Sequence, residues 1–171
     1  MRLYSDIWTD TEVISDSYPF KEVFEGVAVE VKSRMIVKGD EKVDVGCGNA
    51  FGGGGEEEDM GNAEVEKVID LVDSFNYQET GFDKAGFVSY FKGYMKKLLT
   101  HLKEHKPDRV EIFQKGAKDL FAFLKDNFDD LTIYTPKDYD TDNILIYSYY
   151  QGEDLAPTFI YILDGLKSIK L

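Results

Sequence analysis

The chain has 171 residues, 43% of them hydrophobic, and a formal net charge of −13 at pH 7. This length predicts one domain that is large enough to bury a core. The negative charge disfavours nucleic acid and anionic membranes as partners. The sequence has no run of about 18 apolar residues and no apolar segment at its start, so we expect neither membrane insertion nor a signal peptide.

The chain contains one cysteine, Cys47. An intrachain disulfide and a zinc site built from several cysteines are therefore both excluded. This favours a reducing, cytoplasmic location. Cys47 lies among glycines and acidic residues, and nearby carboxylates disfavour the thiolate form that a catalytic cysteine needs.

The first part of the chain predicts short strands at residues 3–7, 27–31 and 35–37. Residues 39–63 differ in composition, with eight glycines and seven acidic residues among 25. Such a segment buries too little apolar surface to offset its ordering entropy, so we expect a long mobile acidic loop. Residues 65–72 then predict a strand, although their apolar content also fits the start of a helix.

From Asp83 onward the apolar residues recur at helical spacing. Pro107 predicts the end of this helix and the start of a second one, because proline fits a first helical turn. The expected product is an antiparallel helical hairpin over residues 83–128 with an apolar inner face. On the first helix, a separate narrow arc is basic and consists of Lys92, Lys96, Lys103 and Lys106.

The charge of the chain is unevenly distributed. Residues 84–118 hold nine Lys or Arg against three Asp or Glu, a local charge of +6, which leaves −19 on the remainder. A basic segment in an acidic protein is a candidate docking surface, and the alternative is an ordinary solvated helical face.

After Asp130 the sequence again predicts strands, at residues 131–135, 144–150 and 158–163. Asp164-Gly165 is typical of a hairpin turn leading into the last segment, 166–171. The expected fold class is therefore α+β, with antiparallel sheets and an inserted helical hairpin.

The sequence lacks the common catalytic motifs. It has no phosphate-binding loop, no nucleophile elbow and no HExxH sequence, so we expect a binding protein and not an enzyme. The only histidines, His101 and His105, have the i, i+4 spacing of some metal sites. Their position on or beside the apolar stripe, without an acidic residue to complete a ligand set, favours packing instead.

Asp138, Asp140 and Asp142 alternate as in the opening of an EF-hand loop. The closing glutamate is missing, because the twelfth position is Tyr149. We expect weak calcium binding here, with a solvated acidic surface as the alternative. Two further acidic clusters are Asp6, Asp10, Glu12 and Asp16, and residues 56–59.

Several motifs along the whole chain are similar to those of one family. They are Tyr4-Ser5-Asp6, residues 12–18, Gln78-Glu79-Thr80-Gly81-Phe82, Tyr94-Met95-Lys96, Lys106-Pro107-Asp108-Arg109-Val110, Gly116-Ala117 and Asp164-Gly165-Leu166. Together they resemble the translationally controlled tumour protein (TCTP) family, also called histamine-releasing factor or fortilin. The resemblance implies a β-tent fold with a projecting helical hairpin.

The resemblance also implies a function: a cytosolic, calcium-binding protein that associates with tubulin and microtubules and binds several other partners. The alternatives that it implies are a guanine-nucleotide-exchange regulator of a small Rheb-like GTPase and a non-classically secreted, histamine-releasing signal. For the GTPase role the resemblance assigns Glu12, while the second acidic position of the family is Lys137 here. We assign tubulin binding to the four lysines of the basic arc.

Two further positions depart from the family pattern. The family's loop signature has a serine where this chain has Phe51, which argues against regulatory phosphorylation there. Many members end in a cysteine that links dimers, whereas this chain ends in Leu171, so we expect a monomer.

Overall fold

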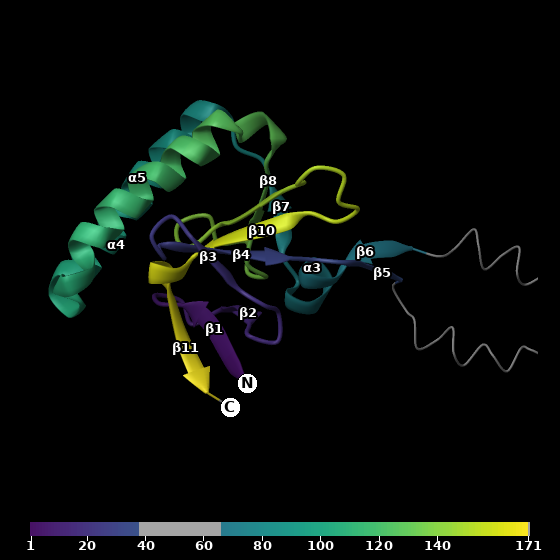
Figure 1. The fold of residues 1–171 in the computed structure, drawn as a ribbon, viewed down its shortest axis with the longest axis horizontal. Helices are drawn as coiled ribbons and strands as arrows, with labels where there is room; N and C mark the ends of the chain where they lie inside the picture. The colour runs from purple at the N-terminus through teal and green to yellow at the C-terminus, as the bar shows by residue number, and fades with distance from the viewer. Residues whose placement is uncertain (38–65, 171) are drawn as a thin grey trace, which may run out of the picture.

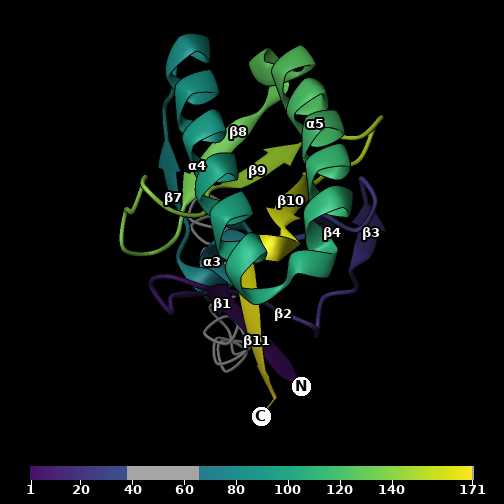
Figure 2. The same ribbon diagram turned by 90° about the vertical axis from the view of Figure 1, so that its left-hand side faces the viewer.

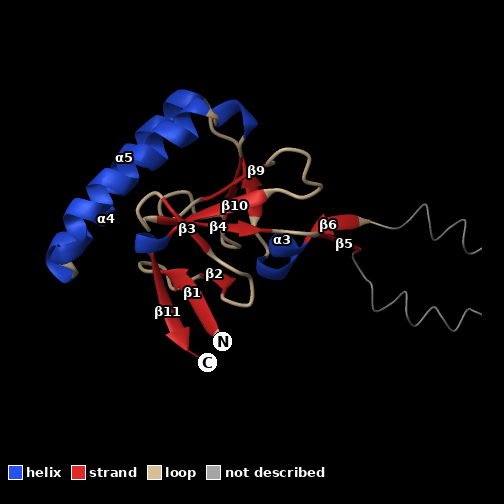
Figure 3. Ribbon diagram, viewed as in Figure 1, coloured by secondary structure: helices blue, strands red, loops and turns tan. Residues whose placement is uncertain are grey.

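A computed structural model describes residues 1–37 and 66–170 of the chain. It combines helices with antiparallel strands, which confirms the expected α+β class (Figure 3). The expected mobile loop at residues 39–63 lies outside the described residues.

The largest sheet has six strands in the order β3-β4-β10-β9-β8-β7, and its registered pairs are antiparallel. All five residues of β10 are buried, which explains why this strand reads as a nearly continuous apolar run. Two edge strands, β3 and β7, escaped sequence analysis because each is short and mainly polar, whereas the equally short but apolar segment 35–37 was predicted. The strands are β3 (Lys21–Val23), β4 (Ala28–Lys32), β7 (Gln78–Thr80), β8 (Thr132–Thr135), β9 (Ile146–Tyr149) and β10 (Thr158–Ile162).

A second sheet of three strands has the order β11-β1-β2 and holds the two ends of the described chain side by side (Figure 1). Its strands are β1 (Arg2–Asp6), β2 (Glu12–Ser15) and β11 (Leu166–Lys170). The hairpin predicted at Asp164-Gly165 was wrong, because β11 pairs with β1 and not with β10. A 3₁₀ turn at Leu163–Gly165 directs the chain from one sheet into the other.

A two-stranded sheet pairs β5 (Met35–Val37) with β6 (Lys67–Ile69). The short helix α3 (Asp70–Phe75) follows at once. Residues 65–72 were expected to be either a strand or the start of a helix, and the described part contains both. The change occurs at Asp70, whose buried carboxylate accepts hydrogen bonds from the backbone amides of Arg34 and Leu71 at 2.9 and 2.7 Å.

The helical hairpin consists of α4 (Lys84–His105) and α5 (Val110–Asp126), joined by a 3₁₀ turn at Pro107–Arg109. Asp83 caps α4 by accepting a hydrogen bond from the Gly86 amide at 2.8 Å. Figure 2 shows the two helices side by side in front of β8, β9 and β10. Their apolar face packs on the sheet through ring contacts such as Phe87 with Tyr147, at 5.8 Å between centroids.

None of the helices in the described part of the chain is both long enough and apolar enough to span a membrane.

Two glycines of the hairpin should respond oppositely to substitution by alanine. A Cβ at Gly116 would lie 2.3 Å from the carbonyl oxygen of Phe24 and 2.4 Å from Cγ2 of Val27, so Gly116→Ala must force the helix away from the strand layer. We expect it to lower the free energy of unfolding by about 2 kcal/mol, as measured by urea denaturation.

Gly93 is the matched control, because a Cβ there meets nothing within 4 Å. Gly93→Ala should raise the free energy of unfolding by about 0.5–1 kcal/mol through helix propensity alone. Equal effects of the two substitutions would contradict the close packing described at Gly116.

Candidate functional site

The buried carboxylate of Asp6 joins two loops at the end of the molecule where the hairpin turns. The residue is 1% exposed. Its Oδ1 accepts hydrogen bonds from the backbone amides of Trp8 and Thr9, at 2.7 and 3.4 Å, and its Oδ2 accepts one from the amide of Ile144 at 3.1 Å. The turn after β1 is thereby fixed to the loop that precedes β9.

Trp8 connects this turn to helix α4. Its ring packs edge-on against His101, at 5.9 Å between centroids, and the ammonium of Lys97 lies 4.1 Å from the ring centroid. Lys97 also donates to the side-chain oxygen of Asn143. Sequence analysis missed Trp8 and Lys97; the signal available was that Trp8 is the single tryptophan of the chain.

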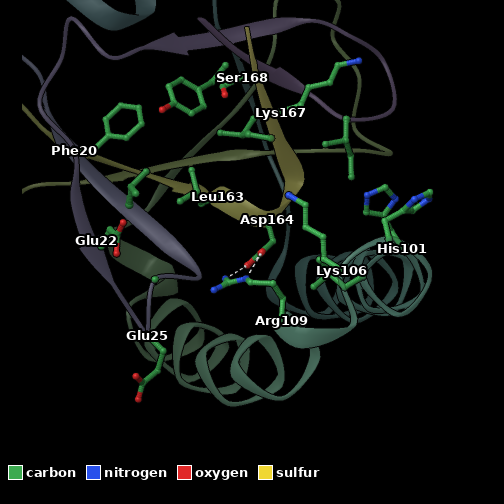
Figure 4. A pocket seen from close by; sticks show the side chains of 17 residues that line it. Phe20, Glu22, Glu25, His101, Lys106, Arg109, Leu163, Asp164, Lys167 and Ser168 are labelled. Carbon is green, nitrogen blue, oxygen red and sulfur yellow. Dashed lines mark hydrogen bonds and ion pairs between the residues drawn. The ribbon is translucent and has the colours of Figure 1, made fainter. Parts of the chain in front are cut away.

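A cleft of about 720 Å³ lies between the tip of the hairpin and the strands (Figure 4). On one wall the guanidinium of Arg109 holds the carboxylate of Asp164 through two hydrogen bonds of 3.1 and 2.8 Å. The Asp164 side chain is 7% exposed, and its hydrogen bonds raise the pKa of Arg109. Other charged or titratable lining residues are Glu22, Glu25, His101, His105, Lys106 and Lys167.

The two histidines differ in burial. His101 is half-buried against Trp8, which agrees with the expected packing role. His105 is exposed, so the same expectation was wrong for it. The helix leaves His105 outside the core because α4 ends there and the chain turns away at Lys106.

The basic arc predicted on α4 lies in the open. Lys92, Lys96, Lys103 and Lys106 are all exposed. A groove of about 360 Å³ lies between the two helices; Lys92 and Lys96 line it, whereas Lys106 lines the cleft of Figure 4. The lining of the groove comes from α4 and α5 alone and consists of Phe91, Lys92, Met95, Lys96, Leu99, Phe113, Gln114, Ala117, Lys118 and Phe121.

The three aspartates expected to bind calcium lie in the loop between β8 and β9, but they do not converge. Asp140 uses Oδ1 to accept from the amide of Asp142 at 2.8 Å and Oδ2 to accept from the side-chain amide of Asn143 at 2.7 Å. Asp138 accepts from the amide of Asp140. Within residues 1–37 and 66–170, no three His, Cys, Asp or Glu side chains are grouped so that they could hold a metal ion. The loop therefore does not offer a preformed calcium site.

Glu12 is exposed at the first position of β2. The hydroxyl of the preceding residue, Thr11, donates to Oδ2 of Asp138 at 2.9 Å. The start of β2 and the loop that carries Lys137 therefore lie side by side, although they are more than 120 residues apart in the sequence.

The comparisons with known proteins agree over nearly the full length. The family model described as translationally controlled tumour protein matches residues 1–167. This chain belongs to the translationally controlled tumour protein family. It is 44% identical to the TCTP homolog of Plasmodium chabaudi chabaudi, with 97% of each chain covered, and 36% identical to TCTP homolog 1 of Dictyostelium discoideum, with 99% of each covered.

Solved structures of TCTP proteins share the fold. The structure of p23fyp from Schizosaccharomyces pombe matches with a TM-score of 0.80 at 33% identity, covering 100% of both chains. The TCTP structure from Caenorhabditis elegans matches with a TM-score of 0.68 at 25% identity, covering 100% of this chain and 99% of that one. The helical hairpin and the sheets described here are therefore the TCTP fold.

The pair of Arg109 and Asp164 should contribute measurably to stability. Arg109→Ala leaves the Asp164 carboxylate buried without its charged partner, and we expect it to lower the free energy of unfolding by about 2 kcal/mol in urea denaturation. Lys32→Ala is the control, because the Lys32–Asp154 pair is 70% and 42% exposed. Loss of the Lys32–Asp154 pair should lower the free energy of unfolding by less than about 1 kcal/mol. If the two substitutions lower the free energy of unfolding equally, the Arg109–Asp164 pair stabilises the protein no more than a surface pair does.

Proposed function

We propose that this chain is a binding protein for several partners, and that the outer face of its helical hairpin docks on the acidic surface of tubulin or microtubules. The observation that supports the proposal most directly is the exposure of Lys92, Lys96 and Lys103 along α4 and of Lys106 directly after its last residue. These lysines belong to residues 84–118, which carry a charge of +6, whereas the remaining residues carry a net charge of −19.

The groove beside the lysines adds a second kind of contact. Six of its ten lining residues are apolar, three are lysines and one is glutamine. Phe91, Phe113 and Ala117 form a buried floor, while Met95 and Leu99 remain partly exposed. An acidic partner segment with one apolar side can therefore bury area in the groove and place its carboxylates on the lysine rim.

Electrostatics support the orientation of such a complex. An acidic partner attracts the basic face of this otherwise acidic molecule and repels the rest of its surface. The molecule therefore approaches the partner with the basic face forward. Charges more than about 8 Å apart are largely screened at physiological ionic strength, so this steering acts only in the last stage of the approach. Binding should therefore weaken as salt increases.

Reversal of the four arc lysines to glutamate tests the proposal. We expect it to abolish co-sedimentation with microtubules at about 0.15 M salt, where the unchanged protein still binds, because attraction becomes repulsion. The measurement is the bound fraction in the pellet over a series of tubulin concentrations.

The matched control reverses four exposed lysines outside the hairpin, Lys21, Lys67, Lys137 and Lys170, and so changes the net charge by the same amount. Its binding should fall far less. If both variants bind equally, or if the arc variant binds as well as the unchanged protein, the hairpin is not the docking surface.

Calcium binding is proposed only as a weak interaction of the loop with Asp138, Asp140 and Asp142. An incoming ion must displace the hydrogen bonds that the Asp140 carboxylate accepts, so we expect a dissociation constant on the order of 1 mM. A ¹⁵N NMR titration should show saturable shifts confined to residues 138–143. Shifts that match an Mg²⁺ titration and spread over the acidic surface would reduce calcium to a counterion.

A second candidate function is regulation of nucleotide exchange on a small Rheb-like GTPase. It is favoured by the position of Glu12, which is exposed at the start of β2 beside the loop of Lys137. A partner that contacts Glu12 would also contact Lys137, a positive charge at the position where the family has an acidic residue. The role as a secreted histamine-releasing signal has no comparable support in the described residues.

Nucleotide release measured with a fluorescent GDP analogue tests this second candidate. We expect a modest acceleration by the unchanged protein in high excess, its loss in Glu12→Ala and its increase in Lys137→Glu. Release rates that are the same with and without the protein, or unaffected by Glu12→Ala, would exclude exchange activity at this surface.

A further inference from the structure

The last two turns of α4 carry the only two histidines of the chain side by side. The ring centroids of His101 and His105 are 4.4 Å apart, with an angle of 37° between the ring planes. Residues four apart lie on the same face of a helix, one turn above the other. A nitrogen of each ring can therefore reach one ion.

Both rings are open to a small ion from solution. His105 is exposed and His101 is partly exposed, and both line the cleft of Figure 4. They also line a neighbouring hollow of about 440 Å³ together with Trp8, Lys97, Thr100 and Glu104. An ion can thus approach the pair without any movement of the core.

The ring of His101 is held in an orientation that suits a metal ligand by its contact with Trp8. Burial, followed by the charges of His105 and Lys106, lowers the pKa of His101 and so favours its uncharged form. A metal ligand must be neutral imidazole. The Trp8 ring packs edge-on against His101, and Trp8 is itself fixed by the Asp6 carboxylate.

We propose that His101 and His105 form a chelating site for a divalent transition-metal ion, and that Cu²⁺ binds there more tightly than Zn²⁺. Imidazole nitrogen is a preferred ligand of Cu²⁺, Ni²⁺ and Zn²⁺, and for a given nitrogen site the affinity is highest for Cu²⁺. The hard ions Ca²⁺ and Mg²⁺ prefer oxygen ligands and do not compete. Water completes the coordination.

The charges around the pair keep metal binding weak enough for the ion to exchange with solution. Lys97, Lys106, Arg109 and Lys167 lie at its edges and oppose a cation, although Lys167 is paired with Asp10 and Arg109 with Asp164. Glu104 lies in the same hollow and favours a cation. No third histidine, cysteine or carboxylate of the described residues joins the two rings, so the site differs from a closed structural zinc site.

The single tryptophan provides the reporter for the test, because its ring contacts His101. Cu²⁺ added as its glycine complex should quench the fluorescence of Trp8 in a saturable way. The protein is used as the full chain without an affinity tag and with Cys47→Ser, which removes the thiol as a competing ligand. Zn²⁺ should reverse the quenching at higher concentration, and Ca²⁺ and Mg²⁺ should not.

Two variants separate chelation from binding elsewhere. His105→Asn should weaken Cu²⁺ binding by at least about tenfold, the order by which even the loss of an outer-shell partner weakens a metal site. Lys103→His combined with His105→Asn keeps two histidines, but at i, i+2, where side chains do not face each other. It should bind as weakly as His105→Asn even though it also removes a repelling charge.

The proposal is overturned if quenching does not saturate, or if either variant keeps the affinity of the unchanged protein, because the ion then binds outside the pair. Far-UV circular dichroism of each variant checks that the hairpin is intact. The ¹⁵N resonances of the two imidazoles provide a second readout. In the unchanged protein, both should shift on addition of Zn²⁺. In His105→Asn, the resonances of the remaining His101 should not shift at the same Zn²⁺ concentration.

Discussion

The arrangement of the candidate site depends on one buried carboxylate. Asp6 is almost completely enclosed, and its two oxygens accept amides from both the turn after β1 and the loop before β9. Charged acceptors make stronger hydrogen bonds than neutral ones, and an enclosed carboxylate is tolerated only when it is bonded in this way. The positions of Trp8, whose ring packs on His101, and of Thr11 beside Asp138 both follow from this anchor.

The hairpin depends on a different constraint, which is close approach to the strand layers. Gly116 allows α5 to touch the backbone of Phe24, and Gly165 leaves room for the hydroxyl of Tyr94 at 2.2 Å from where a Cβ would lie. Aromatic rings then fill the space between the helices and β9. Because the apolar face of α4 is fixed against the sheet, its lysine arc is turned to solvent, where a partner can reach it.

Much of this architecture was predictable from local patterns. The helical period of α4 and the proline after it located the hairpin, because a long amphipathic helix has a strong sequence signal. The strands β2, β3 and β7 were missed because each has at most four residues and begins with a charged or polar side chain, whereas the equally short but apolar β5 was predicted. The turn at Asp164-Gly165 was misread because the pairing of β11 with β1 is decided by contacts between residues 160 or more positions apart.

The candidate site was predictable only in part. The lysine arc follows from helical geometry, whereas Asp6 was grouped with Asp10, Glu12 and Asp16 because the sequence does not show which member of an acidic cluster is buried. The pairing of Arg109 with Asp164 and the contact of Trp8 with His101 join residues that are 55 and 93 positions apart, so no spacing rule could have found them.

Amide hydrogen exchange in Asp6→Asn tests the role of this anchor most directly. The substitution keeps the size of the side chain but replaces one accepting oxygen with a donor and removes the charge. We expect the amides of Trp8, Thr9 and Ile144 to lose protection, while those of β9 and β10 remain protected. Unchanged protection at the three amides would show that the two loops are held in place by other contacts, and would contradict the account.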